Sequence, residues 1–205
     1  MSVFEALEGG VNKLNVALNK QQIEALQNFV GLLQKWNKNF NLTAINDESQ
    51  IISKHILDSL SALPYLQGNN IIDVGTGAGL PGLPLAIACA QKEFLLLDAN
   101  AKKISFVQQA IIELGLNNVQ VLHQRVEKYS PLTEFDTVIS RAFASGNKLL
   151  TALDHLYTGG QVLVMLGKQN SLQDIPKRYN LQVVHPIEIP TLKANRHIAV
   201  IRKAC

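Results

Sequence analysis

Cysteine is scarce in this chain of 205 residues, and its two copies, Cys89 and Cys205, are far apart. Neither belongs to a C-x-x-C pattern or lies near a cluster of histidines in the sequence. We therefore expect neither a zinc site nor a disulfide framework. Cys89 falls in an apolar, helix-like stretch and is expected to be a small core residue.

Long apolar runs are also missing, because no stretch approaches the roughly 18 residues that a membrane-spanning helix requires. Residues 1–10 contain Glu5 and Glu8 but no basic residue, which is not the pattern of a secretory signal peptide. We therefore expect a cytoplasmic protein with no membrane partner. The length fits one well-buried domain with a modest addition rather than two full domains.

The formal net charge is only +3, but the charge is unevenly distributed. Residues 1–140 are slightly acidic, whereas residues 141–205 hold nine basic and three acidic side chains. A basic C-terminal third could face the phosphates of a nucleic acid. A solvated surface on a mildly basic protein is an equally open interpretation.

The first 70 residues have a helical pattern. Asn19-x-x-Gln22 resembles a capping box and precedes an apolar stripe at helical spacing, made of Ile23, Leu26, Val30, Leu33 and Trp36. Asp47-x-x-Gln50 predicts a second helix start, with Pro64 beyond the end of that helix. The asparagine-rich stretch 37–45 between the two helices is predicted to be irregular.

From residue 71 onward, strand and helix patterns alternate. Short apolar strands are predicted at 71–74, 94–97, 119–122, 137–139 and 161–166, with helices at about 82–91, 101–114 and 145–157. Gly115 marks the predicted end of the second of these helices. This alternation predicts an α/β fold with a parallel sheet covered on both faces.

The chain finishes with two strand-like runs, 181–189 and 196–203, joined by a turn-sized segment. We expect an antiparallel hairpin there. The whole pattern predicts an N-terminal helical extension at 1–66, packed on a single compact domain at 67–205.

The stretch "DVGTGAG" (73–79) lies directly after the first predicted strand and is rich in glycine. Gly77-Ala78-Gly79-Leu80-Pro81-Gly82 satisfies the dinucleotide fingerprint G-x-G-x-x-G. Starting at Asp73, the same stretch instead reads as the acidic-x-G-x-G-x-G loop of S-adenosylmethionine (SAM) enzymes. Both cofactors bind at the carboxyl ends of parallel strands, and both often use an acid that ends the second strand, here Asp98.

Three features favour the methyl donor. Asp73 would repel the pyrophosphate of a dinucleotide but could approach the ammonium group of the methionine moiety. The roughly 120 residues after the loop are too few to add a substrate domain. The terminal hairpin is the expected ending of the Rossmann-like, seven-stranded SAM-dependent methyltransferase sheet. The alternative is that Asp73 and Asp98 merely cap helices.

With these motifs in place, the chain resembles the RsmG family, also called glucose-inhibited division protein B. The resemblance extends from about residue 35 almost to the C-terminus. Five stretches carry it: "NKNFNLTAI" (37–45), "HILDSL" (55–60), "DVGTGAGLPGLPLAI" (73–87), "SRAFAS" (140–145) and "RHIAVIRK" (196–203). The resemblance implies an enzyme that methylates N7 of a specific guanine in 16S ribosomal RNA, with SAM as cofactor and the small ribosomal subunit as partner.

The resemblance also implies site residues. Gly75, Leu80, Val126 and Glu127 would contact SAM, and Arg141 would lie between cofactor and substrate. With the residues singled out by the loop itself, the expected SAM site comprises Asp73, Gly75, Gly77, Gly79, Leu80, Asp98, Ala99, Val126, Glu127 and Arg141. Arg141 could instead be structural, paired with Asp73 or Asp136. His55 and Asp58 could form a catalytic pair but more readily anchor the helical extension.

Guanine N7 carries an in-plane lone pair with no proton to remove, so we predict neither an essential general base nor a metal. RNA must be selected through phosphate contacts and folded shape. The candidates for this role are Lys38, Asn39, Arg141, Lys148, Lys168, Lys193, Arg196 and Arg202, with Phe40 or Phe143 as stacking platforms. Many relatives have Leu-Lys-Gly where this chain has Leu166-Gly167-Lys168, which weakens a role for Lys168.

Three rival functions stay open at this point. The first is a SAM-dependent methyltransferase of a small molecule or protein, and the second is a nicotinamide oxidoreductase. The third is a noncatalytic module that binds SAM or RNA. We expect a monomer.

Overall fold

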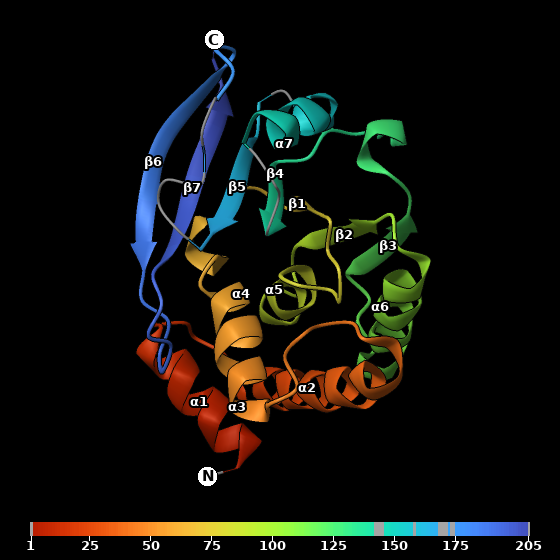
Figure 1. The fold of residues 1–205 in the computed structure, drawn as a ribbon, viewed down its shortest axis with the longest axis vertical. Helices are drawn as coiled ribbons and strands as arrows, with labels where there is room; N and C mark the ends of the chain where they lie inside the picture. The colour runs from red at the N-terminus through yellow and green to blue at the C-terminus, as the bar shows by residue number, and fades with distance from the viewer. Residues whose placement is uncertain (1, 142–145, 158, 168–171, 173–174, 205) are drawn as a thin grey trace.

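The computed structural model describes residues 2–141, 146–157, 159–167, 172 and 175–204. A seven-stranded sheet in the order β3-β2-β1-β4-β5-β7-β6 crosses the molecule (Figure 1). Strands β1 to β5 are parallel, and β7 pairs antiparallel with both β5 and β6. The predicted α/β fold with a terminal hairpin is confirmed. The strands are β1 (Asn70–Val74), β2 (Glu93–Asp98), β3 (Val119–His123), β4 (Thr137–Arg141), β5 (Gln161–Leu166), β6 (Tyr179–Ile187) and β7 (Arg196–Lys203).

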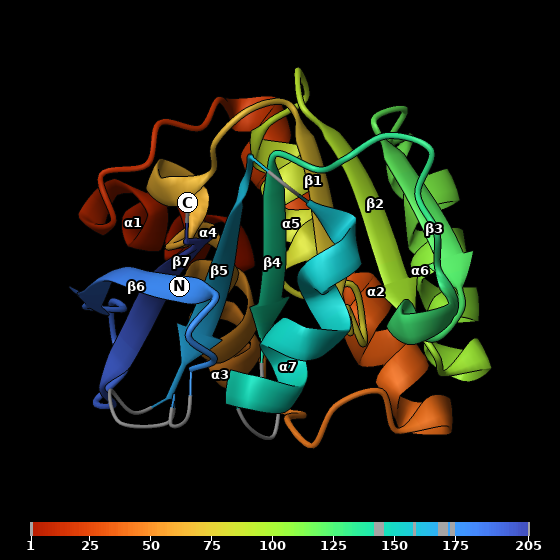
Figure 2. The same cartoon turned by 90° about the horizontal axis from the view of Figure 1, so that it is seen from above.

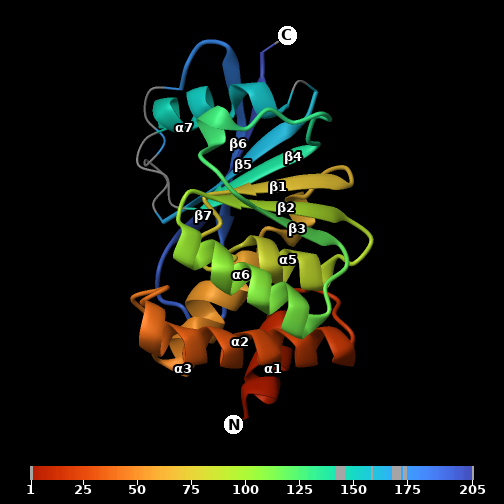
Figure 3. The ribbon, with the colours of Figure 1, turned by 90° about the vertical axis from the view of Figure 1, so that its right-hand side faces the viewer.

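Helices cover both faces of the sheet. Figure 3 shows α7 (Gly146–Leu153) on one face and α5 (Gly82–Ala88) and α6 (Ala101–Leu114) on the other. The described residues also include the short 3₁₀ helices η2 (Leu63–Tyr65), η3 (Val126–Lys128) and η4 (Asp154–Leu156). The central strands β1, β4 and β5 are buried almost throughout, because both faces of the sheet are covered there.

Two capped helices begin the chain. In α2 (Lys20–Phe40) the capping box joins Asn19 and Gln22, as predicted. In α1 (Val3–Lys13) a second capping box, which was not predicted, joins Ser2 and Glu5. The prediction that 37–45 is irregular is wrong for its first four residues, because α2 continues to Phe40. Asn37 can lie in the helix because both ends of its buried side-chain amide are paired. The Nδ2 group donates to Asn46, and the side-chain Oδ1 accepts from the Thr43 N–H.

A third helical run leads to the sheet and changes its winding along the way. It consists of α3 (Glu48–Ile51), a π-helical segment η1 (Ile52–Leu57) and α4 (Asp58–Leu60). Asp47 caps the start by accepting from the Gln50 N–H at 2.9 Å. The second half of the predicted capping box does not form, because the Gln50 side chain instead accepts from Lys54 Nζ.

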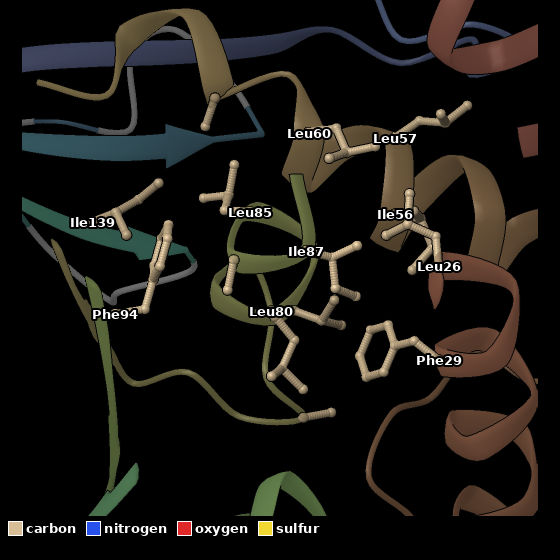
Figure 4. Close-up of a cluster of buried hydrophobic side chains, with 14 of the residues drawn as sticks. Leu26, Phe29, Ile56, Leu57, Leu60, Leu80, Leu85, Ile87, Phe94 and Ile139 are labelled. Carbon is tan, nitrogen blue, oxygen red and sulfur yellow. The ribbon is translucent and has the colours of Figure 1, made fainter. Parts of the chain in front are cut away.

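These N-terminal helices pack on α5 and α6 and form a further layer (Figure 3). Their apolar stripes share one buried cluster with the sheet, in which Leu26 and Phe29 of α2 face Leu80 and Ile87 (Figure 4). Cys89 belongs to the same cluster, as predicted. The Gln22 side chain donates to the carbonyls of Ile87 and Ala88 at the end of α5.

The helix predicted at 145–157 is α-helical only to Leu153 and continues as η4, and the hairpin strand predicted at 181–189 ends at Ile187. Two further ends shifted for identifiable reasons. Helix α5 ends at Ala88, not 91, where the Asn118 amide donates to the carbonyls of Ala86, Cys89 and Lys92. The first hairpin strand begins at Tyr179 rather than 181, because the Tyr179 hydroxyl is anchored by Leu150 O and Asp154. Helix α6, in contrast, has its predicted bounds and its predicted left-handed Gly115 cap. Among the described residues, no helix is both long and apolar enough to cross a lipid bilayer.

Candidate functional site

The carboxyl ends of β1 to β5 meet along one edge of the sheet (the lower edge in Figure 2). There the chain leaves β1 in a turn whose glycines alternate with other residues: Gly75, Gly77 and Gly79 have φ of 74°, 61° and 77°. Side chains with a Cβ are strained in this left-handed region, which explains the glycine spacing. The N–H groups of Gly75 and Thr76 donate to Leu97 O and fasten the turn to β2.

Asp73 lies fully buried behind the glycine turn. Its Oδ2 accepts from the Thr76 hydroxyl at 2.6 Å and from the Gly82 N–H at 2.8 Å. This carboxylate therefore does cap α5, as the structural alternative predicted. Its Oδ1 has no hydrogen-bond partner among the described residues. Burial raises the pKa of Asp73 to about 6, against the lowering effect of its hydrogen bonds and of Arg141.

Asp98 ends β2 beside the same turn. Its Oδ2 accepts from the Gly77 N–H and its Oδ1 from the Asn100 N–H, both at 2.8 Å. The idea that Asp98 caps the 101–114 helix is wrong, because Asn100 does so by accepting from the N–H groups of Lys102 and Lys103. Asp98 thus shapes the glycine turn and stays partly exposed at its rim.

A cavity of about 180 Å³, here called the glycine-turn cavity, opens between the ends of β1, β2 and β3. Five of the predicted cofactor residues line it, namely Gly75, Asp98, Ala99, Val126 and Glu127. The remaining wall comes from Val74, Leu97, Gln124 and Arg125. Sequence reasoning missed Gln124 and Arg125, although their position directly after β3 was a usable signal.

The other predicted cofactor residues stand behind or beside this cavity. Gly77 and Gly79 form the turn, and Leu80 is buried in the core with its N–H donating to Thr76 O. Lys103, which the sequence analysis did not single out, places its Nζ on the open side of Gly77, 3.8 Å from where a Cβ would sit. Arg141 lines a different cavity.

That second cavity, here called the arginine cavity, has a volume of about 340 Å³ and lies at the ends of β4 and β5. Its polar lining comes from Lys54, His55, Asp58, Ser61, Arg141, Arg196 and His197, and its apolar lining from Ile45, Met165, Leu166, Ile187 and Ile198, with Gly167 between. The helical extension therefore supplies part of the wall. Of these residues, only His55, Asp58, Arg141 and Arg196 were predicted as site candidates.

Asp58 pairs with two arginines of the sheet across this cavity. Its Oδ1 accepts from Arg196 Nε at 3.1 Å, and its Oδ2 lies 3.5 Å from Arg141 Nη1. Arg141 pairs with neither predicted alternative; Asp136 instead accepts from the N–H groups of Asn69 and Asn70. Burial raises the pKa of Asp58, and the two guanidinium groups oppose this rise.

His55 faces the same cavity but serves as a tether. Its Nε2 is 2.8 Å from the Thr43 hydroxyl and its Nδ1 is 3.2 Å from Lys54 O. Burial, assisted by the positive charge of Arg141, lowers the pKa of His55 to about 4. At neutral pH the ring is therefore uncharged and joins the 41–46 loop to η1. Asp58 thus links the extension to the sheet, as the anchoring interpretation predicted, whereas the hydrogen bonds of His55 stay within the extension.

The predicted RNA-contacting residues are scattered. Lys38 and Asn39 are exposed in the last turn of α2. Phe40 stacks on Trp36 with 4.9 Å between ring centroids. Lys193 is exposed before β7, and Arg202 donates to Gln67. Phe143, Lys168 and the side chain of Lys148 lie outside the described residues. Among described side chains, no group of three His, Cys, Asp or Glu is placed to hold a metal ion.

The chain is similar to known proteins in both sequence and fold. The chain is 44% identical to "Ribosomal RNA small subunit methyltransferase G" of Marinomonas sp. (strain MWYL1), covering 99% of both chains. It is 45% identical to the protein of that name from Haemophilus influenzae (strain PittEE), covering 92% of this chain and 94% of the relative. Among solved structures, magnesium protoporphyrin IX methyltransferase from Synechocystis PCC 6803 with bound SAM has a TM-score of 0.59 at 16% identity. The match covers 91% of this chain and 99% of that structure's chain.

The solved structure supports the fold alone, whereas the sequence matches show ancestry. A sequence model of the GidB family, described as rRNA small subunit methyltransferase G, matches residues 22–199. With nearly full-length relatives above 40% identity, the chain belongs to the GidB family of rRNA small subunit methyltransferases.

Proposed function

We propose that this protein transfers a methyl group from SAM to N7 of one guanine in the 16S ribosomal RNA of the small subunit, as a cytoplasmic monomer. The observation that carries the proposal is the adjacency of the two cavities. The Ser140 hydroxyl donates to Val74 O at 2.8 Å, which joins the ends of β4 and β1. Val74 lines the glycine-turn cavity, and Arg141, next to Ser140, lines the arginine cavity. A donor and an acceptor bound in these cavities would meet at that junction.

The glycine-turn cavity fits SAM by the chemistry of its donors and acceptors. Asp98 would accept from the ribose hydroxyls, and Glu127 from the adenine amino group, beside Ala99 and Val126. The unpartnered Oδ1 of Asp73, behind the glycine turn, is the proposed acceptor for the methionine ammonium. Gly75, Gly77, Gly79 and Leu80 would shape the turn around the methionine moiety. When bound, SAM supplies an electrophilic methyl group.

The protein's own contribution is alignment. Because guanine N7 already presents a lone pair, no side chain has to remove a proton. Holding nucleophile, methyl carbon and sulfur nearly in line is worth on the order of 7–11 kcal/mol of the barrier. The neutral His55, with both ring nitrogens engaged, suits a structural role rather than proton transfer. We therefore assign no general base and no metal.

The arginine cavity is the proposed binding site for the acceptor base. Its apolar residues would contact the faces of the purine, and Arg141 and Arg196 would donate to acceptor oxygens of the nucleotide. Lys38, Asn39, Lys148 and Lys168 would contact phosphates farther along the RNA. Few charges are available for this, so we expect modest affinity with strong salt dependence and a preference for assembled subunits over naked RNA.

The experiment uses labelled SAM and small subunits from a strain that lacks this protein. Mapping the labelled nucleotide identifies the RNA, the base and the atom together. Label at guanine N7 supports the proposal, whereas label on another atom or on ribosomal protein contradicts it. Product formed from a small molecule without RNA would favour the alternative methyltransferase function. In a melting experiment SAM should raise the melting temperature, and NAD should not.

A further inference from the structure

Asp58 is the least accessible charge in the arginine cavity. Its side chain is only 7% exposed, whereas those of Arg141 and Arg196 are 22% and 25% exposed. The carboxylate comes from the helical extension, and the two arginines come from β4 and β7, 83 and 138 residues away. The buried Asp58 carboxylate therefore binds both guanidinium groups, which remain partly exposed to the cavity.

The winding of the preceding helix contributes to this arrangement. Within the π-helical segment η1, the Lys54 carbonyl accepts from Arg141 Nη1 at 3.2 Å, so Arg141 contacts the extension at two points. A π-helical segment leaves carbonyls differently oriented from those of an α-helix and often occurs at functional sites. The Lys54 ammonium itself is exposed and bonds to Gln50. It is therefore not part of the cluster.

The charges of the cluster do not cancel. One carboxylate faces two guanidinium groups, which leaves a net charge of about +1 beside apolar walls. Such a site favours a ligand with oxygen acceptors, for example a base carbonyl or a phosphate, because arginine donates to these in fixed geometry. Without Asp58 the two arginines would repel each other and lose their common orientation.

We propose that Asp58 is a positioning residue for the acceptor RNA: it holds Arg141 and Arg196 in the orientation that binds the target nucleotide. The helical extension thereby completes the acceptor site instead of only covering the sheet. This inference rests on the proposed function, because it takes the arginine cavity as the place of the acceptor. Asp58 itself would touch neither SAM nor the reacting atoms.

The test compares Asp58→Asn with a matched control, Asp154→Asn. Asp154 is also a carboxylate between two cations, Arg178 and Lys203, but it lines neither cavity. We expect D58N to raise KM for small subunits about tenfold or more, with the SAM dissociation constant changed less than about twofold. D154N should leave both unchanged. Equal effects of the two variants, or a parallel loss of SAM binding in D58N, would overturn the proposal.

A double-mutant cycle with Arg196→Gln tests whether Asp58 acts through the arginines. If it does, D58N should raise KM far less in the R196Q background than in the wild type. Full additivity would contradict the proposal. Should D58N fail to fold, R196Q alone decides, since an unchanged KM there would exclude the arginine as an acceptor contact. A wild-type protein that does not methylate rRNA refutes the proposed function itself, whereas an active D58N with wild-type KM refutes only this inference.

Discussion

The two cavities on the carboxyl edge of the sheet are built in opposite ways. The glycine-turn cavity depends on backbone conformation and on backbone N–H groups held by Asp98, and its lining comes from residues 74–127. The arginine cavity depends on charged side chains from three distant segments, joined through Asp58. The first should therefore be sensitive to changes in backbone geometry, and the second to changes in charge.

The largest expected effect comes from Gly79→Ala. At Gly79 φ is +77°, and an added Cβ would lie 2.7 Å from the Leu83 Cγ atom. Left-handed strain and overpacking together should lower the free energy of unfolding by about 4 kcal/mol and abolish SAM binding. Urea denaturation and calorimetric titration with SAM measure the two quantities.

Gly115→Ala is the matched control. Gly115 has φ of +63° but no atom within 4 Å of the added Cβ, and it lies at the end of α6 away from both cavities. The backbone strain alone should lower the free energy of unfolding by about 1–2 kcal/mol and leave the affinity for SAM unchanged. If G79A binds SAM as tightly as G115A does, the backbone of the turn does not form the donor site.

The next effect concerns two buried titratable groups, Asp73 behind the glycine turn and His55 in the wall of the arginine cavity. Burial raises the pKa of Asp73 to about 6. Between about pH 4 and 6 the folded chain holds the Asp73 proton and the unfolded chain does not, so the contribution of Asp73 to the free energy of unfolding falls as the pH rises. Burial lowers the pKa of His55 to about 4, so its contribution rises between about pH 4 and 6.5. Each contribution is about 3 kcal/mol, and in the wild type they nearly cancel.

Single substitutions should uncover these opposite slopes. His55→Gln leaves the Asp73 contribution, so the free energy of unfolding should fall by about 3 kcal/mol between pH 4 and 6. Asp73→Asn leaves the His55 contribution, and the free energy should rise by a similar amount up to pH 6.5. Urea denaturation at a series of pH values measures both slopes. Parallel pH profiles for the two variants would show that these groups are not buried in the way described.

A smaller effect, about 2 kcal/mol, is expected from Asp98→Asn. Its carboxylate accepts two backbone N–H groups and, in the proposed complex, the ribose hydroxyls, so the SAM dissociation constant should rise tenfold to about a hundredfold. Asp136→Asn is the control, because Asp136 also accepts two backbone N–H groups but at the start of β4, on the opposite edge of the sheet. Equal SAM binding by the two variants would remove Asp98 from the donor site.

The same contrast explains which parts of the molecule were predictable. The strands, the capping box of α2 and the bounds of α6 follow from patterns within a few residues of each other. The glycine turn and Asp98 are also local, since parallel strands bring their carboxyl ends to one edge. For this reason, five of the predicted cofactor residues line a single cavity.

The arginine cavity could not be built from local patterns. The sequence marks Asp58, Arg141 and Arg196 separately, but nothing in its periodicity predicts that residues 83 and 138 positions apart form one cluster. The π-helical winding of η1 was likewise invisible, because Ile52–Leu57 has an ordinary helical pattern. The end of α5 moved because the side chain of the distant Asn118 binds the carbonyls there.

The smallest expected effect is on RNA binding by a surface residue outside the arginine cavity. Lys38 is exposed at the end of α2 and belongs to neither cavity, so its role would be a single screened phosphate contact. Lys38→Gln should weaken binding of small subunits by less than about 1 kcal/mol and reduce the slope of log affinity against log salt by about 0.7–0.9. Filter binding at several salt concentrations measures the slope. Lys20→Gln, in the first turn of the same helix, is the control and should leave it unchanged; an equal change in both variants would mean that general surface charge, rather than a contact at Lys38, attracts the RNA.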